Sequence, residues 1–323
     1  MTAEKIVVFG YGPTGRALVE RLHAKGRAVT VVQRSRPADL AAGADFLRAD
    51  LLDRDAVLAV TRSASHIAMT AGFVYDRRIW ARDWPIAMAN LLAAAEATGA
   101  KTVFLDNLYM FGPQDGPIAE ETPFAPAKGK PAVRVGVTAQ WQEAARAGRV
   151  RFAALRAPDF YGPGVTNSHL GDMAFGALAR GRTAVLVAPA DRPHDVAYVP
   201  DIGRALETLL DAPDDAYGQA WHMPSAPTRT LREILALGAA AIGVKPRVLA
   251  IPLGLLPALG IIQPMFGELA ELRFTWDRPY RVDGSKFARR FWGDVTPFEV
   301  GAAATARAFA AGAGRVLTPS SAS

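Results

Sequence analysis

Apolar and polar positions follow two patterns along the first half of the chain. Short β-branched runs predict buried strands at residues 5–10, 28–34, 65–70, 101–107 and 150–157. Ala- and Leu-rich stretches between them predict helices at residues 15–26, 86–100 and 139–148. Neighbouring parallel strands need a crossover helix and are buried on both faces. The repetition therefore predicts an α/β fold built on a doubly wound parallel sheet.

The pattern loosens after Pro163, where apolar runs shorten and Pro and Gly become frequent, although residues 201–213 still predict a helix. We expect a nucleotide-binding domain over residues 1–160. A smaller C-terminal substrate-binding lobe is expected over residues 161–323, with segments that return to the main sheet. Because ligands of open α/β sheets bind at the carboxyl ends of the strands, the lobe should cover that edge.

The composition of the chain limits the kinds of ligand and partner that the protein can bind. The net charge is +6, but no long run of Lys or Arg suggests nucleic-acid binding, and the diffuse positive charge favours an anionic ligand. The chain has no cysteine, which excludes disulfides and thiolate chemistry. The most apolar segment, residues 251–266, is short and contains three prolines, so it cannot span a bilayer. We expect a cytoplasmic protein without a membrane partner.

Three glycines lie where the first predicted strand meets the first helix. Gly10 permits a tight turn, Gly12 lets the main chain approach a pyrophosphate, and Gly15 lets the helix pack close to the strand. The helix N-terminus offers N–H groups and a partial positive charge to phosphates. This context predicts a Rossmann dinucleotide site rather than a glycine-rich turn without a ligand. The contacts expected here are Gly10, Tyr11, Gly12, Pro13, Thr14 and Gly15.

The end of the second strand bears on the choice of cofactor. A dinucleotide fold usually places an acidic residue there for the ribose 2′-hydroxyl, but this chain has Arg34 and Arg36 and no acid. Guanidinium groups can pair with a 2′-phosphate, so we favour NADP over NAD. Solvated surface charges are the alternative. Asp50, followed by Leu51, is placed to accept from the adenine amino group, or to serve as a loop or cap residue.

Several motifs in order resemble the extended short-chain dehydrogenases/reductases, the NAD-dependent epimerase/dehydratase relatives. They are "VFGYGPTGR", "RADLLD", "IAMANLLAAAEATGAKTVFLDNLYMFG", "LRAPDFYGPG" and "VAYVPDIGRAL", and the resemblance runs from about Ile6 to Phe298. It implies a Rossmann fold and nicotinamide cofactor binding. The member is atypical, because the family's first loop glycine is replaced by Phe9.

The family's catalytic Tyr-x-x-x-Lys is missing. In the corresponding region Lys130 stands where the tyrosine is expected and Arg134 where the lysine is expected. Arg134 could keep the cationic, ribose-binding half of the arrangement, but it cannot shuttle protons because it stays charged. Lys130 is a candidate acid if it is desolvated, with a solvated surface lysine as the alternative.

Tyr109 is the leading candidate for the proton. The strand at residues 101–107 leads into "LYMFG", which matches the family's Ser-Ser-x-x-Val-Tyr-Gly stretch and puts Asn107 at the usual Ser/Thr position. Tyr109 falls where sugar dehydratases of the family have a catalytic carboxylate. Asn107 could hydrogen-bond a substrate carbonyl and Tyr109 could donate to it. A packing aromatic is the alternative for Tyr109.

The remaining candidate contacts with the cofactor and the substrate lie in four short stretches of the sequence. Thr70, Ala71 and Gly72 follow the fourth predicted strand and should line the cofactor, as should Pro158 in the "LRAPDFYGPG" motif. The candidate substrate contacts are Phe73, Tyr75, Trp80, Tyr161, His169 and His194. The aromatic residues suit a hydrophobic or cyclic substrate, or they form ordinary core, and a lone histidine such as His169 is often structural.

His194 replaces the arginine with which nucleotide-sugar enzymes of the family hold a diphosphate, and this weakens such a substrate. We therefore expect an NADP-dependent oxidoreductase acting on a carbonyl or alcohol of a small non-nucleotide molecule. A sugar epimerase or dehydratase, or a dinucleotide-sensing protein without catalysis, are the alternatives. The five histidines lack metal-ligand spacing, so no metal is expected, and a homodimer is expected by analogy with the family.

Overall fold

A parallel sheet of seven strands forms the centre of the molecule in this computed structural model, which describes residues 4–126 and 128–316. The strand order is β11-β6-β5-β4-β1-β2-β3, and every pairing is parallel. The strands are β1 (Ile6–Phe9), β2 (Val29–Gln33), β3 (Asp45–Arg48), β4 (His66–Met69), β5 (Lys101–Asp106), β6 (Arg151–Arg156) and β11 (Ala220–His222). This is the predicted doubly wound Rossmann sheet.

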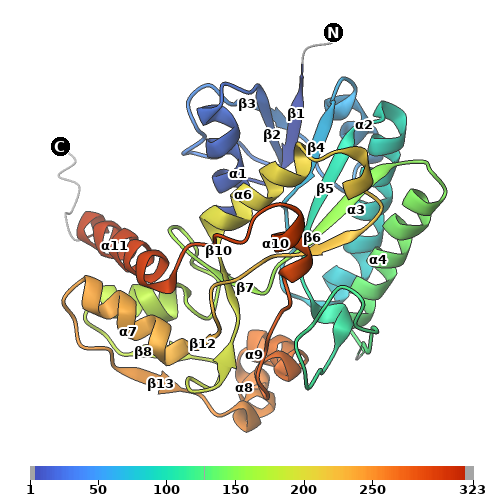
Figure 1. Cartoon of the computed structure of the whole chain (residues 1–323). Helices are drawn as coiled ribbons and strands as arrows, with labels where there is room; N and C mark the ends of the chain where they lie inside the picture. Colours follow the sequence, from blue (N-terminus) through green and yellow to red (C-terminus); the bar gives the residue numbers. More distant parts are fainter. Residues whose placement is uncertain (1–3, 127, 317–323) are drawn as a thin grey trace.

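Alternate side chains of β1 enter two separate cores, as the two-residue period of a strand requires. Ile6 and Val8 pack with α1 (Pro13–Ala24) and α6 (Val199–Leu210) on one face. Val7 and Phe9 pack on the other face with α2 (Arg54–Thr61), α3 (Arg77–Thr98) and α4 (Lys130–Arg146). The two helical layers are seen on either side of the sheet in Figure 1.

Two helices begin earlier than the sequence pattern suggests. The helix expected at residues 86–100 begins at Arg77, where the Asp76 carboxylate accepts hydrogen bonds from the first turn, and it continues through Pro85. The helix expected at residues 139–148 begins at Lys130. Both early segments contain residues of the candidate site, Trp80 in α3 and Lys130 and Arg134 in α4, outside the helices that the sequence predicts.

Most of the remaining elements form the second lobe at the carboxyl edge of the sheet (Figure 1). Paired short strands build it: β7 (Asp159–Tyr161) with β10 (Val196–Tyr198), β9 (Pro193–His194) with β12 (Arg229–Thr230), and β8 (Ala184–Leu186) with β13 (Val248–Ala250). The helices are η2 (Gly171–Gly176), α5 (Ala177–Ala179), α7 (Leu231–Ala241), η4 (Leu253–Leu255), α8 (Leu256–Ile262), α9 (Pro264–Ala270), η5 (Arg273–Thr275) and α11 (Phe298–Val316).

Segments of the second half also complete the main sheet. Strand β11 pairs with β6 at the edge, and α6 covers the face that it shares with α1. The short helices η3 (Asp214–Ala216) and α10 (Ser285–Arg290) flank β11. Within residues 4–126 and 128–316, no helix has both the length and the apolar character needed to cross a bilayer.

Candidate active site

The turn between β1 and α1 needs its first glycine for conformation and for space. Gly10 has φ +94°, a left-handed conformation that favours glycine, and a Cβ there would lie 2.7 Å from the main chain of Ala71. The Thr70 hydroxyl donates to the carbonyls of Phe9 (3.1 Å) and Gly10 (3.0 Å). Thr70 and Ala71 therefore hold the turn against the end of β4.

The other two loop glycines differ in what surrounds them. A Cβ on Gly15 would collide with the Gly10 carbonyl oxygen and lie 2.7 Å from the Thr70 hydroxyl oxygen, whereas a Cβ on Gly12 would meet no atom within 4 Å. Gly12 precedes the first turn of α1, where N–H groups have no helical partner. The open space beside Gly12 and these N–H groups fit a dinucleotide pyrophosphate.

The end of β2 is neutral where dinucleotide folds usually have an acid. The Gln33 side chain accepts from the Tyr11 N–H (3.1 Å) and donates to the Ser35 carbonyl (2.7 Å). Arg34 and Arg36 are exposed beside it. Asp50 accepts from the Leu52 N–H (3.0 Å), so one of its oxygens stabilises a turn. An adenine contact by Asp50 or Leu51 stays a prediction.

Lys130 is not a surface lysine. Its side chain is fully buried at the start of α4, and its ammonium donates to the carboxylates of Glu268 and Glu271 (2.6 Å to Glu271). The Lys130 N–H also donates to Glu271 (2.6 Å). The ammonium lies 5.0 Å from the centre of the Tyr75 ring. With two carboxylates engaging its donors, Lys130 holds α9 against α4.

Arg134 lies one turn further along α4, beneath aromatic rings. Its guanidinium carbon is 3.8 Å from the ring centre of Trp84 and 4.9 Å from that of Trp80, and one guanidinium nitrogen is 3.2 Å from Asp106. Asp106 also faces buried Arg156. Burial raises the pKa of Asp106, and the two guanidinium groups oppose that shift. The Arg134 guanidinium thus packs against the rings of Trp80 and Trp84. A contact of Arg134 with the cofactor ribose stays a prediction.

Tyr109 lies in η1 (Tyr109–Phe111), directly after β5, among the predicted aromatic residues. The Tyr75 hydroxyl donates to the Tyr109 hydroxyl (3.0 Å), and the Tyr109 ring stacks on Trp80 with centres 6.3 Å apart. Burial raises the pKa of Tyr109, and the negative charge of Asp159 adds to the shift. Tyr109 is therefore a neutral phenol whose proton remains available to a ligand.

Asn107 directly precedes this turn. Its side-chain carbonyl accepts from the Tyr109 N–H (3.0 Å), which fixes the side chain at the end of β5. Its amide nitrogen makes no hydrogen bond within the described residues and can donate to a substrate oxygen. The structure thus brings together Asn107, Tyr109, Tyr75 and Trp80, while Phe73 packs edge-on against Trp84 with ring centres 5.0 Å apart.

Asp159, at the start of β7, is the carboxylate on the side of the candidate site that the second lobe forms. Its Oδ2 accepts from His194 Nε2 (3.1 Å) and Trp276 Nε1 (3.3 Å), and His169 Nε2 lies 3.9 Å away. Although burial alone would raise it, the hydrogen bond from His194 and the neighbouring His169 lower the pKa of Asp159 to about 2. Asp159 is therefore ionised at neutral pH.

The rings around this carboxylate fix its orientation. His194 stacks on Tyr280 with ring centres 4.9 Å apart, and His169 meets Trp276 edge-on at 4.4 Å. Asp159 Oδ1 makes no hydrogen bond with any described residue, and the side chain keeps 22% of its surface exposed. One oxygen is thus held by the protein, and the other is free to accept from a ligand.

Tyr161 is wrong as a substrate contact. It is 1% exposed and packs in the core of the second lobe between Tyr198 and Phe298, with ring centres 5.3 and 5.7 Å away. A Cβ on Gly301 would collide with its hydroxyl. Tyr161 lies on the same side of β7 as Asp159 but two residues deeper into the lobe, about 7 Å further along the strand.

Sequence reasoning missed Asp159, Trp276 and Tyr280. The signal for Asp159 was an acid directly after the buried strand β6, in "LRAPDFYGPG". Nothing local indicates Trp276 and Tyr280, because they reach the site from a segment more than 100 residues away. Across the described residues, no group of three His, Cys, Asp or Glu side chains could hold a metal ion.

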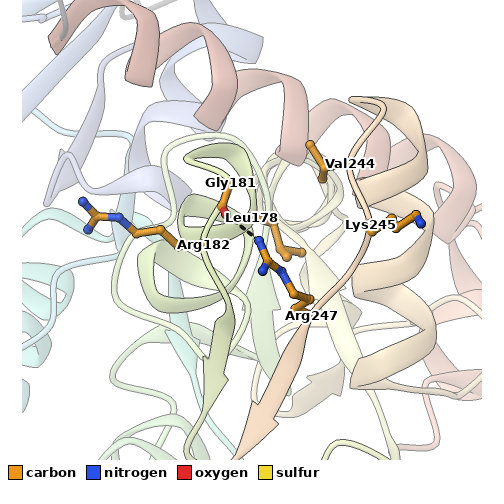
Figure 2. Close-up of a pocket in the computed structure, with 6 residues that line it drawn as sticks. All are labelled: Leu178, Gly181, Arg182, Val244, Lys245 and Arg247. Atoms are coloured by element: carbon orange, nitrogen blue, oxygen red, sulfur yellow. Dashed lines mark hydrogen bonds between the residues drawn. The ribbon is translucent and has the colours of Figure 1, made fainter.

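A separate hollow of about 440 Å³ lies in the second lobe, away from these residues, between the end of α5 and the segment before β13. It is lined by Leu178, Gly181, Arg182, Val244, Lys245 and Arg247. Figure 2 shows Arg247 turned toward the Gly181 carbonyl, to which it donates (3.0 Å), while Arg182 and Lys245 point away in opposite directions. These cations do not converge on a common point, and the hollow is not part of the candidate site.

The fold is similar to those of solved nucleotide-sugar enzymes. UDP-glucose 4-epimerase of Thermus thermophilus, solved with NAD, is 21% identical with a TM-score of 0.74, over 94% of this chain and 98% of that one. dTDP-glucose 4,6-dehydratase of Bacillus anthracis, also with NAD, is 15% identical with a TM-score of 0.76, over 95% and 96%. UDP-glucose 4-epimerase of Thermotoga maritima, solved with UDP-glucose, is 17% identical with a TM-score of 0.77, over 96% and 99%.

Comparison with curated proteins gave no significant match. The model of the NAD-dependent epimerase/dehydratase family matches residues 6–222, which contain the glycine turn, Tyr109, Lys130 and Asp159. This match alone covers more than half of the chain, and the parallel sheet and the open space beside Gly12 agree with it. The protein belongs to the NAD-dependent epimerase/dehydratase family.

Proposed function

We propose that this protein is a nicotinamide-dinucleotide-dependent oxidoreductase that acts on an alcohol or carbonyl of a small substrate without a nucleotide group. The observation that carries the proposal is the hydrogen-bonded pair of Asp159 and His194. An ionised carboxylate on the substrate side of the site would repel a diphosphate, and its histidine partner offers no guanidinium fork to compensate.

Each part of the site has a chemical role in this proposal. Gly12 and the first turn of α1 hold the dinucleotide, which supplies or accepts a hydride when bound. Tyr109 donates the proton to the substrate oxygen, and Asn107 orients that oxygen through its free amide. The free oxygen of Asp159 accepts from a substrate hydroxyl and fixes its orientation. These roles account for a site without the family's tyrosine and lysine.

NADP is the cofactor form we propose. Arg34 and Arg36 follow β2 at the position where a carboxylate would select a free ribose hydroxyl, and Gln33 is neutral. Neither arginine forms an ion pair within the described chain, so both remain available to a 2′-phosphate. The relatives with a dinucleotide described above were solved with NAD, which makes this preference a property to test.

Sugar epimerisation or dehydration is the second candidate function, and the structural neighbours favour it. They are a UDP-glucose 4-epimerase and a dTDP-glucose 4,6-dehydratase that match nearly the full chain. A bound dinucleotide can accept a hydride from a sugar hydroxyl, so the same cofactor site would serve such a reaction. On this alternative, the substrate would be a sugar whose recognition does not depend on an arginine at position 194.

The test separates the candidates in one preparation. NADPH consumption is followed spectrophotometrically with a panel of neutral ketones, aldehydes and sugars, and with UDP-glucose and dTDP-glucose. The proposal predicts turnover with a neutral compound and at least a tenfold loss in Tyr109→Phe. Interconversion of nucleotide sugars without net NADPH loss would instead establish the second candidate. Dinucleotide binding without turnover on any compound would identify a sensor and contradict both.

A further inference from the structure

The apolar segment at residues 251–266 forms a two-helix cap at the edge of the molecule. Residues 253–267 contain no charged side chain and cover α8 and the first half of α9, and the two helices fold back on each other. The two helices meet closely at Gly260, where a Cβ would lie 2.8 Å from the Gly267 main chain. In Figure 1 the pair lies at the bottom of the molecule, away from the main sheet and from both termini.

The outer side of this cap is apolar and exposed. Ile261 and Ile262, at the end of α8, are 87% and 84% exposed, and Leu255 and Met265 are about half exposed. Ile261 and Ile262 are neighbours on a helix, so they project about 100° apart. A protruding tip with apolar groups in several directions is poorly covered by one flat protein face, but lipid chains can surround it.

The inner side of the cap is polar and tied to the candidate site. Glu268 on α9 and Glu271 just beyond it hold the buried ammonium of Lys130, and Glu268 also accepts from the Arg77 N–H (3.0 Å). Lys130 in turn lies against Tyr75, whose hydroxyl is bonded to Tyr109. The polarity of the cap is thus divided between a charged inner side and an apolar outer tip.

Basic side chains surround the attachment of α9. Arg77 and Arg78 at the start of α3 and Lys128 before α4 are exposed and form no ion pair within the described residues. The acids among them are Asp76, whose carboxylate caps α3, and Glu268 and Glu271, which the Lys130 ammonium engages. Arg77, Arg78 and Lys128 therefore add exposed positive charge beside the cap, on a chain with net charge +6, and this charge would attract an anionic surface.

We propose that the α8–α9 cap docks the protein on an anionic lipid surface, with Ile261 and Ile262 inserted among the acyl chains. Docking of this kind does not require a spanning helix, so it is compatible with a segment too short to cross a bilayer. A second copy of the chain, the other candidate occupant, would need a broad complementary face, whereas the most exposed groups here form a narrow tip.

Vesicle co-sedimentation of the full chain tests this directly. The probes are vesicles of equimolar phosphatidylcholine and phosphatidylglycerol, and vesicles of phosphatidylcholine alone. The proposal predicts retention on the mixed vesicles and weaker retention on the neutral ones. Replacing Ile261→Ser and Ile262→Ser together should lower partitioning by at least about tenfold, because two buried aliphatic side chains are lost from the lipid.

A matched control comes from another exposed aliphatic residue. Val300 on α11 is 58% exposed and lies outside the cap, so Val300→Ser should partition like the unmodified protein. Failure of the unmodified protein to sediment with mixed vesicles, or equal sedimentation of the Ile261→Ser/Ile262→Ser variant, would overturn the proposal. A fall in oligomer mass in that variant, measured by light scattering without lipid, would assign the tip to a second copy instead.

Discussion

The two halves of the candidate site are built in different ways. The cofactor half uses main-chain N–H groups, three glycines and Thr70, all within β1, α1 and the end of β4. The substrate half uses side chains that arrive from β5, α3, β7, β9 and the segment after α9. A site made of local backbone tolerates few substitutions, whereas a site made of distant side chains can change its chemistry while the fold stays the same.

Substitution within the glycine turn should produce the largest effect and tests the claim that backbone space defines the cofactor half. Gly15→Ala puts a methyl group onto the Gly10 carbonyl and the Thr70 hydroxyl. We expect it to lower the free energy of unfolding by about 3 kcal/mol, because the Gly10 carbonyl is main chain and the Thr70 hydroxyl is held by its hydrogen bonds to Phe9 and Gly10. Urea denaturation measures this change.

Gly12→Ala is the matched variant, because a Cβ there meets nothing within 4 Å. We expect the free energy of unfolding to stay within about 1 kcal/mol of the unmodified value. Affinity for NADPH should nevertheless fall by about tenfold or more in calorimetry, because the methyl group occupies space meant for the pyrophosphate. Unchanged affinity would mean that the dinucleotide does not lie beside Gly12.

Asp159→Asn tests the substrate half, with a smaller effect on the fold. It keeps the shape and removes the charge, so turnover should fall by about a hundredfold while NADPH affinity is unchanged. A parallel loss of NADPH affinity would contradict the division of the site into two halves.

The pH dependence of stability gives a second readout for the same residue. Because the folded-state pKa of Asp159 is lowered to about 2, its ionised form stabilises the fold above about pH 4. That contribution, about 2 kcal/mol, is lost as the pH falls from 4 toward 2. Asp159→Asn should lack this part of the acid transition in thermal melts. An acid transition that is the same in both proteins would refute the stabilising role of the ionised Asp159 carboxylate.

Replacing Arg34→Ala and Arg36→Ala together should give the smallest effect. Both side chains are exposed, so loss of their pairing with a 2′-phosphate should weaken NADPH binding by about tenfold and leave NADH binding unchanged. Arg62→Ala, an exposed arginine at the end of α2, is the control. An equal loss for both dinucleotides would assign the two arginines to general electrostatics.

The sequence predicted the sheet and the glycine turn well, because both follow from local patterns. β-Branched runs marked the first strands, and Gly10, Gly12 and Gly15 lie where a strand meets a helix. The early turns of α3 and α4 were missed because Pro85, Pro131 and Gly136 are atypical of helix interiors. A proline in the first turn, such as Pro131, costs little in the folded chain.

The substrate half depended on contacts between distant residues, which no local pattern reveals. Lys130 could be placed in the family's tyrosine position, but its partners Glu268 and Glu271 lie about 140 residues away. Asp159 gains its low pKa from His194 and His169, which were singled out separately and without their partner. Tyr161 was wrongly predicted because its burial depends on packing against α11, which lies far along the chain.

The sheet is completed late in the chain, by α6 and β11, and this order affects folding during synthesis. Helix α6 lies so close to α1 that a Cβ on Gly203 would be 2.8 Å from the Ala17 main chain, and Ile202, Leu206 and Leu209 fill the core beneath. A nascent chain that has left the ribosome only as far as residue 160 therefore exposes the apolar part of that face which α6 later covers beside α1. Until residue 222 emerges and β11 joins β6, that intermediate should depend on chaperones.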